Sequence, residues 1–549
     1  MEGPGRSSDG TAANRAHRPM TIPELLRLRA DDAPDVVALV DAASGRSLTY
    51  GELLERAEAI ATALESTGVA AGDRVASVLP NGIASVEIWL ACTLLRAIEA
   101  PIHVAYRGEL LDNLLQLADP AAIVVDTELL SSLGDVVLAS MPEVPVLVVG
   151  HPEAAEELGA PAGVDARQLD ALVAQARPEG EMDRDLPAIS DPACLLFTSG
   201  TTGGSSAVLC TYTQEFESAM AAPPAFDGPE IIYSTSPPNH VGQKLFLVKA
   251  LATASSFVMR PTFSVSHFWS DVRRYRCTHT LLIGAAASYL QAQPRTPDDA
   301  NHALRSVVMI PLHPQVRDIR ERFGIEIHSL YNMTEICPVA TITDAEVTDH
   351  HTCGRVRDGF DWRLVDEFDR EVALGEPGEL ILRPDRPWVF SRGYWRDPEK
   401  TVAAWRNLWF HTGDVFTADA QGYLTFLDRK KDVVRRGGEN ISSAELERII
   451  QALPEVGECA VVGVPSEHTE EEIKLVIVPS SGQELSLRAL HEKLRQELPP
   501  FMVPRYLEVS GELPKTPTMK VRKALLRDEG PSGVDARDGF RPVASSVDE

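Results

Sequence analysis

The sequence lacks three features that would define its class at once: a long apolar run, a paired-cysteine motif and an excess of positive charge. No stretch approaches the roughly 18 consecutive apolar residues of a membrane-spanning helix, and Met1 to Pro19 contain no apolar core of a signal peptide. The formal charge of −28 excludes a general attraction to nucleic acid or anionic membranes, because both are negative themselves. We therefore expect a soluble, cytoplasmic protein with no nucleic-acid or membrane partner, in which an anionic ligand needs a local positive site.

Cysteine is scarce and scattered. The seven cysteines are odd in number and form no CxxC pair, a pattern that favours reduced thiols over a disulfide framework. His350, His351 and Cys353 lie close together in the sequence, but a zinc site needs about four ligands and no second cluster occurs. A structural metal site is therefore not expected there.

The length and the apolar pattern predict an α/β protein of more than one domain. A chain of 549 residues is too long for one ordinary core. Apolar residues recur at helical spacing from Tyr50 to Leu64, and the strand-like stretch 75–79 follows a polar turn. Further short apolar runs alternate with helical patterns, as strands flanked by helices do; they lie at 121–125, 144–149, 194–197 and 281–283.

The pattern changes after Gly422. A strand-like stretch at 423–427 precedes a charged run and the Gly437-Gly438 turn, and residues 442–445 have capping-box spacing before an amphipathic helix. Strand-like runs at 460–464 and 475–478 and a helix carrying leucines from 487 to 498 complete a small α+β unit. We expect a large N-terminal domain of several subdomains, joined by a hinge to a small C-terminal domain, and flexible tails where Gly, Ser, Asp, Ala and Pro predominate. The expected bounds are tail 1–18, large domain 19–430, small domain 431–529 and tail 530–549.

A loop of small and hydroxyl-bearing residues follows the apolar run at 194–197. Backbone N–H groups and hydroxyls of such a loop can approach phosphate oxygens closely. No Gly-Lys-Ser/Thr ends the loop, so it is not a Walker A loop, and by itself a Ser/Gly linker is an equal alternative. The candidate phosphate contacts are Thr198, Ser199, Gly200, Thr201 and Thr202.

Further motifs follow this loop in a fixed order. With the loop they resemble the adenylate-forming superfamily of acyl-CoA synthetases, luciferases and peptide-synthetase adenylation domains, over roughly residues 20–528. The closest resemblance, through the segments at 438–443, 504–506 and 514–520, is to carnitine/crotonobetaine-type CoA ligases. The motifs are Tyr-Asn-Met-Thr-Glu at 331–335, His-Thr-Gly-Asp at 411–414, Asp-Arg-Lys-Lys-Asp at 428–432 with Gly-Gly-Glu-Asn at 437–440, and a Pro-Lys-Thr segment that ends at Lys520.

The resemblance implies a site for ATP and Mg²⁺, because adenylation moves negative charge onto phosphate oxygens that cations must stabilise. Glu335 would hold Mg²⁺ and Thr334 would donate a hydrogen bond to the α-phosphate. Tyr331 would pack on adenine, although a buried core aromatic is the alternative. Asn332, where the family commonly has glycine, lies in the same nucleotide-binding segment.

The resemblance also assigns roles to both sides of the expected hinge. Asp414 matches the carboxylate that accepts both ribose hydroxyls, and Arg429 would be a second ribose or phosphate contact. Lys431 matches the hinge residue about which the small domain swings between two half-reactions. Lys520 matches the C-terminal lysine that bridges the carboxylate and the α-phosphate in the transition state.

Other residues would bind the acid and coenzyme A. Gly437, Gly438 and Glu439 would lie along the entry of the pantetheine arm, unless they form an ordinary turn. His240 matches a position that lines the acid pocket, and a structural hydrogen bond is the alternative for this side chain. Three small residues would leave room for an aryl or branched group, unless they reflect tight packing; they are Gly284, Ala285 and Ala286. Asn239 stands where relatives favour Phe.

One residue departs from the family pattern. Ser206 replaces the lysine that normally ends the phosphate loop. A charge-assisted hydrogen bond contributes roughly 1.5–3 kcal/mol, so its loss would weaken phosphate binding about tenfold to a hundredfold.

The predicted function is an AMP-forming ligase that activates a small carboxylic acid and transfers it to coenzyme A, acting as a monomer or homodimer. Two alternatives remain. An adenylating enzyme with another acceptor would be an amide ligase or a nitrite-activating diazotase acting on an aryl amine. A degenerate nucleotide-binding protein would explain Ser206 but leaves Glu335, Asp414, Arg429 and Lys520 without a purpose.

Overall fold

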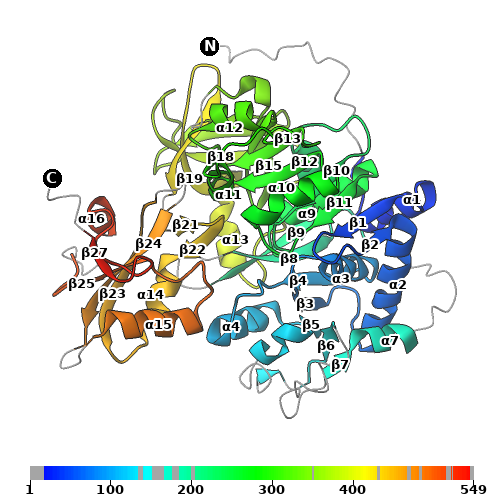
Figure 1. Ribbon diagram of the computed structural model, residues 1–549, viewed down its shortest axis with the longest axis horizontal. Coiled ribbons are helices and arrows are strands. Elements are labelled where there is room, and N and C mark those ends of the chain that lie inside the picture. Colours follow the sequence, from blue (N-terminus) through cyan, green and yellow to red (C-terminus); the bar gives the residue numbers. More distant parts are fainter. Residues whose placement is uncertain are drawn as a thin grey trace.

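The computed structural model describes most of the chain in several ranges, namely residues 18–133, 140–141, 143–150, 166–175, 185–198, 205–348, 352–429, 433–466, 471–480, 485–514, 521 and 523–543. Within these ranges a large α/β part precedes a smaller α+β part, which lies to one side of it in orange and red (Figure 1). The predicted fold class is confirmed. Among the described residues, no helix combines the length and apolar content needed to cross a bilayer.

The first sheet of the large part has seven strands in the order β7-β6-β5-β3-β4-β8-β9. All neighbours are parallel except β9, which returns antiparallel beside β8. The predicted strands near 75–79, 121–125, 144–149 and 194–197 are confirmed here. The strands are β3 (Arg74–Val78), β4 (Ile98–Pro101), β5 (Ala122–Asp126), β6 (Val146–Val149), β7 (Ala166–Gln168), β8 (Pro192–Thr198) and β9 (Ser206–Thr211).

The second sheet has thirteen strands in the order β17-β18-β19-β20-β16-β15-β14-β13-β12-β10-β11-β1-β2. From β1 to β14 its neighbours are parallel, and from β14 onward they are antiparallel, so β14 is the strand at which the direction changes. The parallel part contains β1 (Val37–Asp41), β10 (Ile231–Ser234), β11 (Ser256–Met259), β12 (His279–Ile283), β13 (Ser306–Ile310) and β14 (Glu326–Met333), with β2 (Ser47–Thr49) antiparallel at its edge. The antiparallel part contains β15 (Ile336–Ile342), β16 (Thr352–Val356), β17 (Phe360–Val365), β18 (Gly378–Pro384), β19 (Phe410–Ala418) and β20 (Tyr423–Arg429).

Helices fill the space between and around these sheets. Eleven of the 12 residues of α3 are buried, and its apolar cluster includes α9 and strands of both sheets. A helix that is apolar all round can only be stable when it is enclosed, so α3 and α9 form a central layer. The helices of the large part are α1 (Ile22–Asp32), α2 (Tyr50–Ser66), α3 (Ile83–Leu94), α4 (Gly108–Ala118), η1 (Thr127–Leu133), α7 (Leu169–Gln175), α8 (Tyr212–Ala221), α9 (Val241–Thr253), α10 (Val265–Arg274), α11 (Gly284–Gln291), α12 (Val316–Phe323), η2 (Asp344–Glu346), α13 (Pro398–Ala404) and η3 (Arg406–Leu408).

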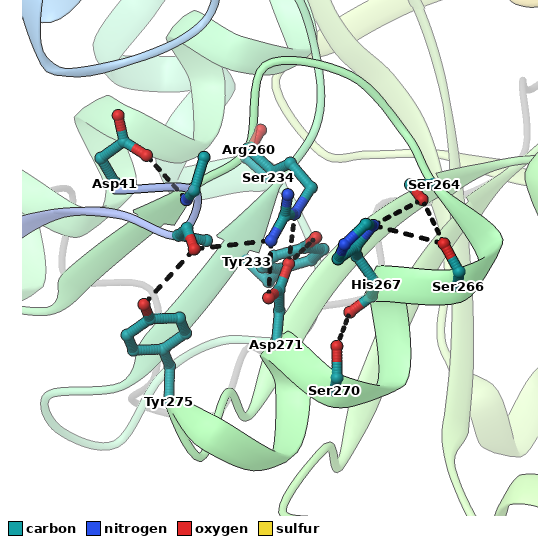
Figure 2. Close-up of polar contacts among 12 residues, drawn as sticks. Asp41, Tyr233, Ser234, Arg260, Ser264, Ser266, His267, Ser270, Asp271 and Tyr275 are labelled. Atoms are coloured by element: carbon teal, nitrogen blue, oxygen red, sulfur yellow. Dashed lines mark hydrogen bonds and ion pairs between the residues drawn. The ribbon is translucent and has the colours of Figure 1, made fainter. Parts of the chain in front are cut away.

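A polar cluster joins α10 to strands β10 and β11 of the second sheet, as Figure 2 shows. Asp271 on α10 accepts hydrogen bonds from the guanidinium of Arg260, just after β11, and from the hydroxyl of Tyr233 on β10, with oxygen distances of 2.9 Å to Arg260 Nη2 and to Tyr233 Oη. Arg260 and Tyr275 also reach the carbonyl of Ala42. Because these polar groups are hydrogen-bond partners of one another, the cluster stabilises the packing of α10 on the sheet.

The small part contains a five-stranded sheet in the order β23-β24-β25-β26-β27 and a separate β21-β22 ribbon. The predicted helix after residues 442–445, the strands near 460–464 and 475–478 and the leucine-bearing helix are confirmed. The elements are β21 (Val433–Arg436), β22 (Glu439–Ser442), α14 (Ser443–Gln451), β23 (Val456–Pro465), β24 (Glu471–Pro479), α15 (Leu487–Glu497), β25 (Tyr506–Val509), α16 (Lys523–Asp528), β26 (Gly533–Asp535) and β27 (Arg541–Val543).

The prediction of a flexible tail at 530–549 is wrong for residues 533–543, which extend this sheet by two strands. Gly533 has φ +79°, and a Cβ there would collide with the carbonyl oxygen of Leu507. Asp535 forms an ion pair with Arg505 at 2.8 Å. The glycine that suggested flexibility is therefore required for the close approach of β26 to β25.

The small part docks on the large part through an apolar contact. Leu110 of α4 is buried in the cluster that contains Leu490 and Leu494 of α15. The ring of Phe501 stands edge-on to His103, with centroids 5.4 Å apart, and to Tyr106, with centroids 6.2 Å apart. Figure 1 shows α15 beside α4 at this contact.

Candidate active site

The two-residue turn between β14 and β15 places Thr334 and Glu335 where the large sheet changes direction. The carbonyl oxygen of Thr334 accepts hydrogen bonds from Gln214 Nε2 at 2.8 Å and from Cys210 Sγ at 3.6 Å, which join the turn to β9 and α8. Open α/β sheets bind ligands outside the carboxyl ends of their strands, and this turn follows the carboxyl end of β14. The turn is therefore held next to the strand that follows the predicted phosphate loop.

Glu335 is a buried carboxylate with a defined partner. The residue is only 7% exposed, and its Oε1 atom accepts a hydrogen bond of 2.8 Å from the hydroxyl of Tyr394. Burial and the neighbouring Glu335 charge raise the pKa of Tyr394, which remains a donor at ordinary pH. A carboxylate oriented by one donor keeps lone pairs for a hard cation such as Mg²⁺.

Tyr331 and Asp414 are brought together from 83 residues apart. The hydroxyl of Tyr331 donates to Asp414 Oδ2 at 2.8 Å, and the two residues are 8% and 2% exposed. The Tyr331 ring also packs edge-on against Phe416, with centroids 4.9 Å apart. Tyr331 therefore packs as a buried core aromatic, which is the alternative to its expected contact with adenine. Its hydroxyl orients the Asp414 carboxylate, which is expected to bind ribose. In the β19–β20 ladder Asp414 pairs with Arg429.

His240 and Glu439 join the two parts of the chain. His240 occupies the N-cap position of α9, and its Nε2 lies 3.0 Å from Oε1 of Glu439, the first residue of β22. Burial by itself lowers the pKa of His240, but the charge and hydrogen bond of Glu439 outweigh it, so the pKa is raised above its ordinary value. Burial conversely raises the pKa of Glu439, and the charge of His240 reverses that effect and lowers it.

The Gly-Gly turn lies against the same region of the large part. Gly437 and Gly438 have φ of +61° and +79°, so both occupy the left-handed region that favours glycine. A Cβ on Gly438 would come within 3.2 Å of the Ile283 side chain, at the end of β12 and directly before Gly284. The turn therefore approaches the residues expected to line the acid pocket. His103 lies close enough for Glu439 and His240 to influence its pKa, which burial lowers.

Two amide oxygens of this region accept no hydrogen bond from the part of the chain that the structure describes. They are Oδ1 of Asn239 and Oδ1 of Asn332, both buried at the level of the atom. A buried acceptor without a donor is costly, so each is a place where a ligand donor would be stabilised.

The ends of the phosphate loop are described, whereas residues 199–204 are not. Thr198 pairs with Ser206 across the β8–β9 ladder, and Ser205 Oγ lies 3.5 Å from Oε1 of Glu445 in the small part. The ammonium of Lys400 donates to Ser206 Oγ at 2.5 Å. Sequence reasoning missed both Lys400 and Tyr394, because they lie in a segment without a recognised motif.

Several predicted residues lie outside the described ranges. These are Ser199, Gly200, Thr201, Thr202, Lys431 and Lys520, together with His350 and His351 of the doubtful metal cluster. All seven cysteines are described and free, as the sequence predicted.

A turn that is expected to bind the nucleotide lies on the large part, and a glycine turn from the smaller part approaches the same region, as expected for a two-domain activating enzyme. Comparison with known proteins agrees. The model of the AMP-binding enzyme family matches residues 26–395, and that of the AMP-binding enzyme C-terminal domain matches residues 445–520. The chain belongs to the AMP-binding enzyme family, and the predicted family and enzyme class, an AMP-forming ligase, are confirmed.

Three relatives illustrate the similarity. A crotonobetaine/carnitine–CoA ligase from Salmonella paratyphi A is 31% identical over 494 residues, which cover 88% of this chain and 93% of that protein. The solved amide bond synthetase from Marinactinospora thermotolerans is 25% identical with a TM-score of 0.78, covering 93% of this chain and 99% of the other. An o-succinylbenzoate CoA synthetase from Bacillus subtilis, bound to a product analogue, shares the fold with 20% identity, a TM-score of 0.76 and coverage of 93% and 99%.

Proposed function

We propose that this enzyme uses ATP to activate a small carboxylic acid as acyl-AMP and then transfers the acyl group to coenzyme A. The observation that carries the coenzyme A step is the contact of the Gly437–Glu439 turn with His240 and Ile283. It places the glycine turn of the small part beside the expected acid pocket, where a thiol must arrive. The named activity of the carnitine-type relatives supports the same acceptor.

The donor set of the site fits a nucleotide and Mg²⁺. The Oδ1 atom of Asn332, buried and without a hydrogen-bond donor in the described residues, suits the amino group of adenine. Asp414, oriented by Tyr331, offers carboxylate oxygen to ribose hydroxyls. Glu335 would hold Mg²⁺, which commonly takes one or two carboxylates beside phosphate oxygens and water. The ion, when bound, neutralises charge on the phosphate oxygens.

Each half-reaction then has its own groups. A carboxylate oxygen of the acid attacks the α-phosphorus, the bond to the bridging oxygen breaks, and pyrophosphate leaves with that electron pair. Thr334 donates to the α-phosphate, and Lys520 approaches the same phosphate from the small domain. In the second step the thiol of coenzyme A loses its proton to solvent, its sulfur attacks the acyl carbon, and the bond from that carbon to the phosphate oxygen breaks so that AMP leaves.

The two steps require the small domain to move. We place the boundary of the domains between residues 430 and 431 and the hinge at Lys431. Contact of Glu439 with His240 supports the thioester-forming arrangement as the one described. Adenylation then needs a swing that brings Lys520 in, a conformational alternation known for enzymes with two half-reactions. We place the enzyme in the cytoplasm. We also expect it to be a monomer or homodimer, and sedimentation of the purified protein tests this oligomeric state.

The experiment is a panel of acids, including carnitine and crotonobetaine, assayed for nucleotide products with and without coenzyme A. We expect AMP and pyrophosphate with the correct acid, and faster consumption of the adenylate when coenzyme A is present. Formation of ADP and inorganic phosphate would exclude adenylation.

An amine acceptor is the second candidate, because the amide bond synthetase is 25% identical and similar over nearly its whole length. A parallel arm therefore supplies alkyl and aryl amines in place of coenzyme A. If amines speed adenylate consumption and coenzyme A does not, the thioester proposal fails and the amide ligase takes its place.

A further inference from the structure

The anion site beside Glu335 needs a cation that its own loop does not contain. Residues 198–206 include Ser, Thr and Gly but neither Lys nor Arg, in a chain with a formal charge of −28. A transferred phosphate group carries negative charge that fixed positive groups must stabilise before the reaction begins. The positive charge must therefore come from another segment of the fold.

Lys400 on α13 reaches this place. Its ammonium donates to Oγ of Ser206 at 2.5 Å, although the two residues are 194 positions apart. Ser206 is the first residue of β9 and pairs with Thr198, the last residue of β8. The charge thus lies where the two strands that enclose the loop meet.

The same ammonium is linked to the carboxylate at the β14–β15 turn. Lys400 Nζ lies 4.3 Å from the centroid of the Tyr394 ring, a distance at which a cation is attracted to the ring face. The hydroxyl of Tyr394 donates to Glu335. Ser206, Lys400, Tyr394 and Glu335 therefore border one region, with a cation at one end and a metal-binding carboxylate at the other.

The backbone that carries Lys400 is fixed before any ligand binds. The carboxylate of Asp397 caps α13 by accepting from the N–H of Lys400 at 2.9 Å, and Thr401 Oγ1 accepts from the N–H of Tyr394 at 2.9 Å. Residue 394 also forms a β-bridge with Val208 of β9. A fixed backbone reduces the conformational freedom that the segment loses when the Lys400 side chain binds an anion.

We propose that Lys400 is the phosphate-binding cation of this site, and that it binds the part of ATP that leaves as pyrophosphate. This inference rests on the proposed ATP-dependent activation. The hydroxyl of Ser206 holds the ammonium at the site in the absence of a nucleotide. A residue distant in the sequence thereby supplies the charge that the loop lacks.

Steady-state kinetics with MgATP test the proposal. For Lys400→Met we expect kcat/KM for ATP to fall about tenfold to a hundredfold, the effect of one charge-assisted hydrogen bond. KM for the acid should stay within about twofold, and inhibition by inorganic pyrophosphate should weaken as kcat/KM does. Lys400→Arg, which keeps the charge, should retain most of the activity. If thermal unfolding shows that Lys400→Met is not folded, Lys400→Gln is used in its place.

Moving the charge separates binding from scaffolding. In the double variant Lys400→Met with Ser206→Lys, the cation returns on the loop itself, and we expect at least a tenfold recovery of kcat/KM for ATP. Arg396→Ala is the matched control, because it removes an ion pair of the same segment with Asp119, outside the site. It should leave the ATP parameters unchanged.

The outcomes are distinct. An unchanged kcat/KM for ATP in Lys400→Met overturns the role of Lys400. A loss that Ser206→Lys does not restore also overturns it, because Lys400 would then only hold β9 in place. Failure of the wild-type enzyme to form AMP and pyrophosphate with any acid would instead contradict the proposed function.

Discussion

The ion pair of His240 with Glu439 gives a quantitative prediction about the balance between the two half-reactions. The nitrogen–oxygen distance is 3.0 Å, and the side chains are 33% and 19% exposed. Exposed pairs contribute about 0.2–1 kcal/mol, and hydrogen bonds to charged groups about 1.5–3 kcal/mol. For this half-buried pair we expect about 1 kcal/mol, which is roughly a fivefold change in the equilibrium constant between the two proposed domain arrangements.

The perturbation is a double-mutant cycle of His240→Ala and Glu439→Gln. Each single variant should slow thioester formation from isolated adenylate about fivefold, whereas acid-dependent pyrophosphate exchange should not fall. The double variant should be no slower than either single variant, which gives a coupling free energy of about 1 kcal/mol. Single-turnover measurement of the two steps provides both values. Additive effects of the two substitutions would refute a direct interaction.

The pH dependence of this coupling has a defined sign. Because the pKa of His240 is raised, its contribution is fully present below the ordinary histidine pKa of about 6.5 and is lost as pH rises through the raised value. Because the pKa of Glu439 is lowered, its contribution is lost only as pH falls through that depressed value. The coupling should therefore be present between these two limits and absent in alkaline buffer. A coupling free energy that does not change with pH would show that charge is not involved.

Further predictions concern the remaining site residues and the end of the chain. Asp414→Ala removes the buried hydrogen bond from the Tyr331 hydroxyl to the Asp414 carboxylate, so we expect a loss of about 1–3 kcal/mol in the free energy of unfolding, with a raised KM for ATP. Denaturant titration gives the first value, and an unchanged midpoint would contradict it. Lys520→Ala should lose most pyrophosphate exchange while ATP still binds in a calorimeter, because a transition-state contact is removed; normal exchange would contradict this role. Lys431→Pro should slow thioester formation more than adenylation, since φ is fixed near −65°, and hydroxylamine should trap the accumulated adenylate; equal slowing of both steps would contradict the hinge. Truncation after Glu529 removes β26 and β27 and should lower the thermal midpoint of the small domain, and an unchanged midpoint would mean that these strands contribute no stability.

The sequence predicted those parts of the structure that depend on local pattern. Strands such as β3 and β8 were identified because parallel strands buried on both faces are short continuous apolar runs. The order of the motifs predicted the family. It also assigned Thr334 and Glu335 to one segment that is expected to bind the nucleotide, and in the structure this segment is the turn between β14 and β15.

Other parts depend on contacts between distant segments, which no local pattern encodes. Lys400 approaches Ser206 because residues 392–395 run beside β9, and neither segment alone indicates the other. The strands at 533–543 were missed since their composition is that of a tail, and their order comes from packing on β25. In both cases tertiary contacts, rather than intrinsic preference, decide the structure.

The apolar contact of Phe501 with His103 and Tyr106, together with Leu110, has a thermal consequence for the catalytic cycle. In the domain swing that we propose, separation of these surfaces would expose hydrocarbon to water, and their return would bury it again. Hydration of apolar surface carries a large heat capacity and a driving force that weakens on cooling. For the proposed pair of domain arrangements, the equilibrium constant would therefore depend on temperature along a curve rather than a line, and cooling would weaken the contact between the small domain and the large one.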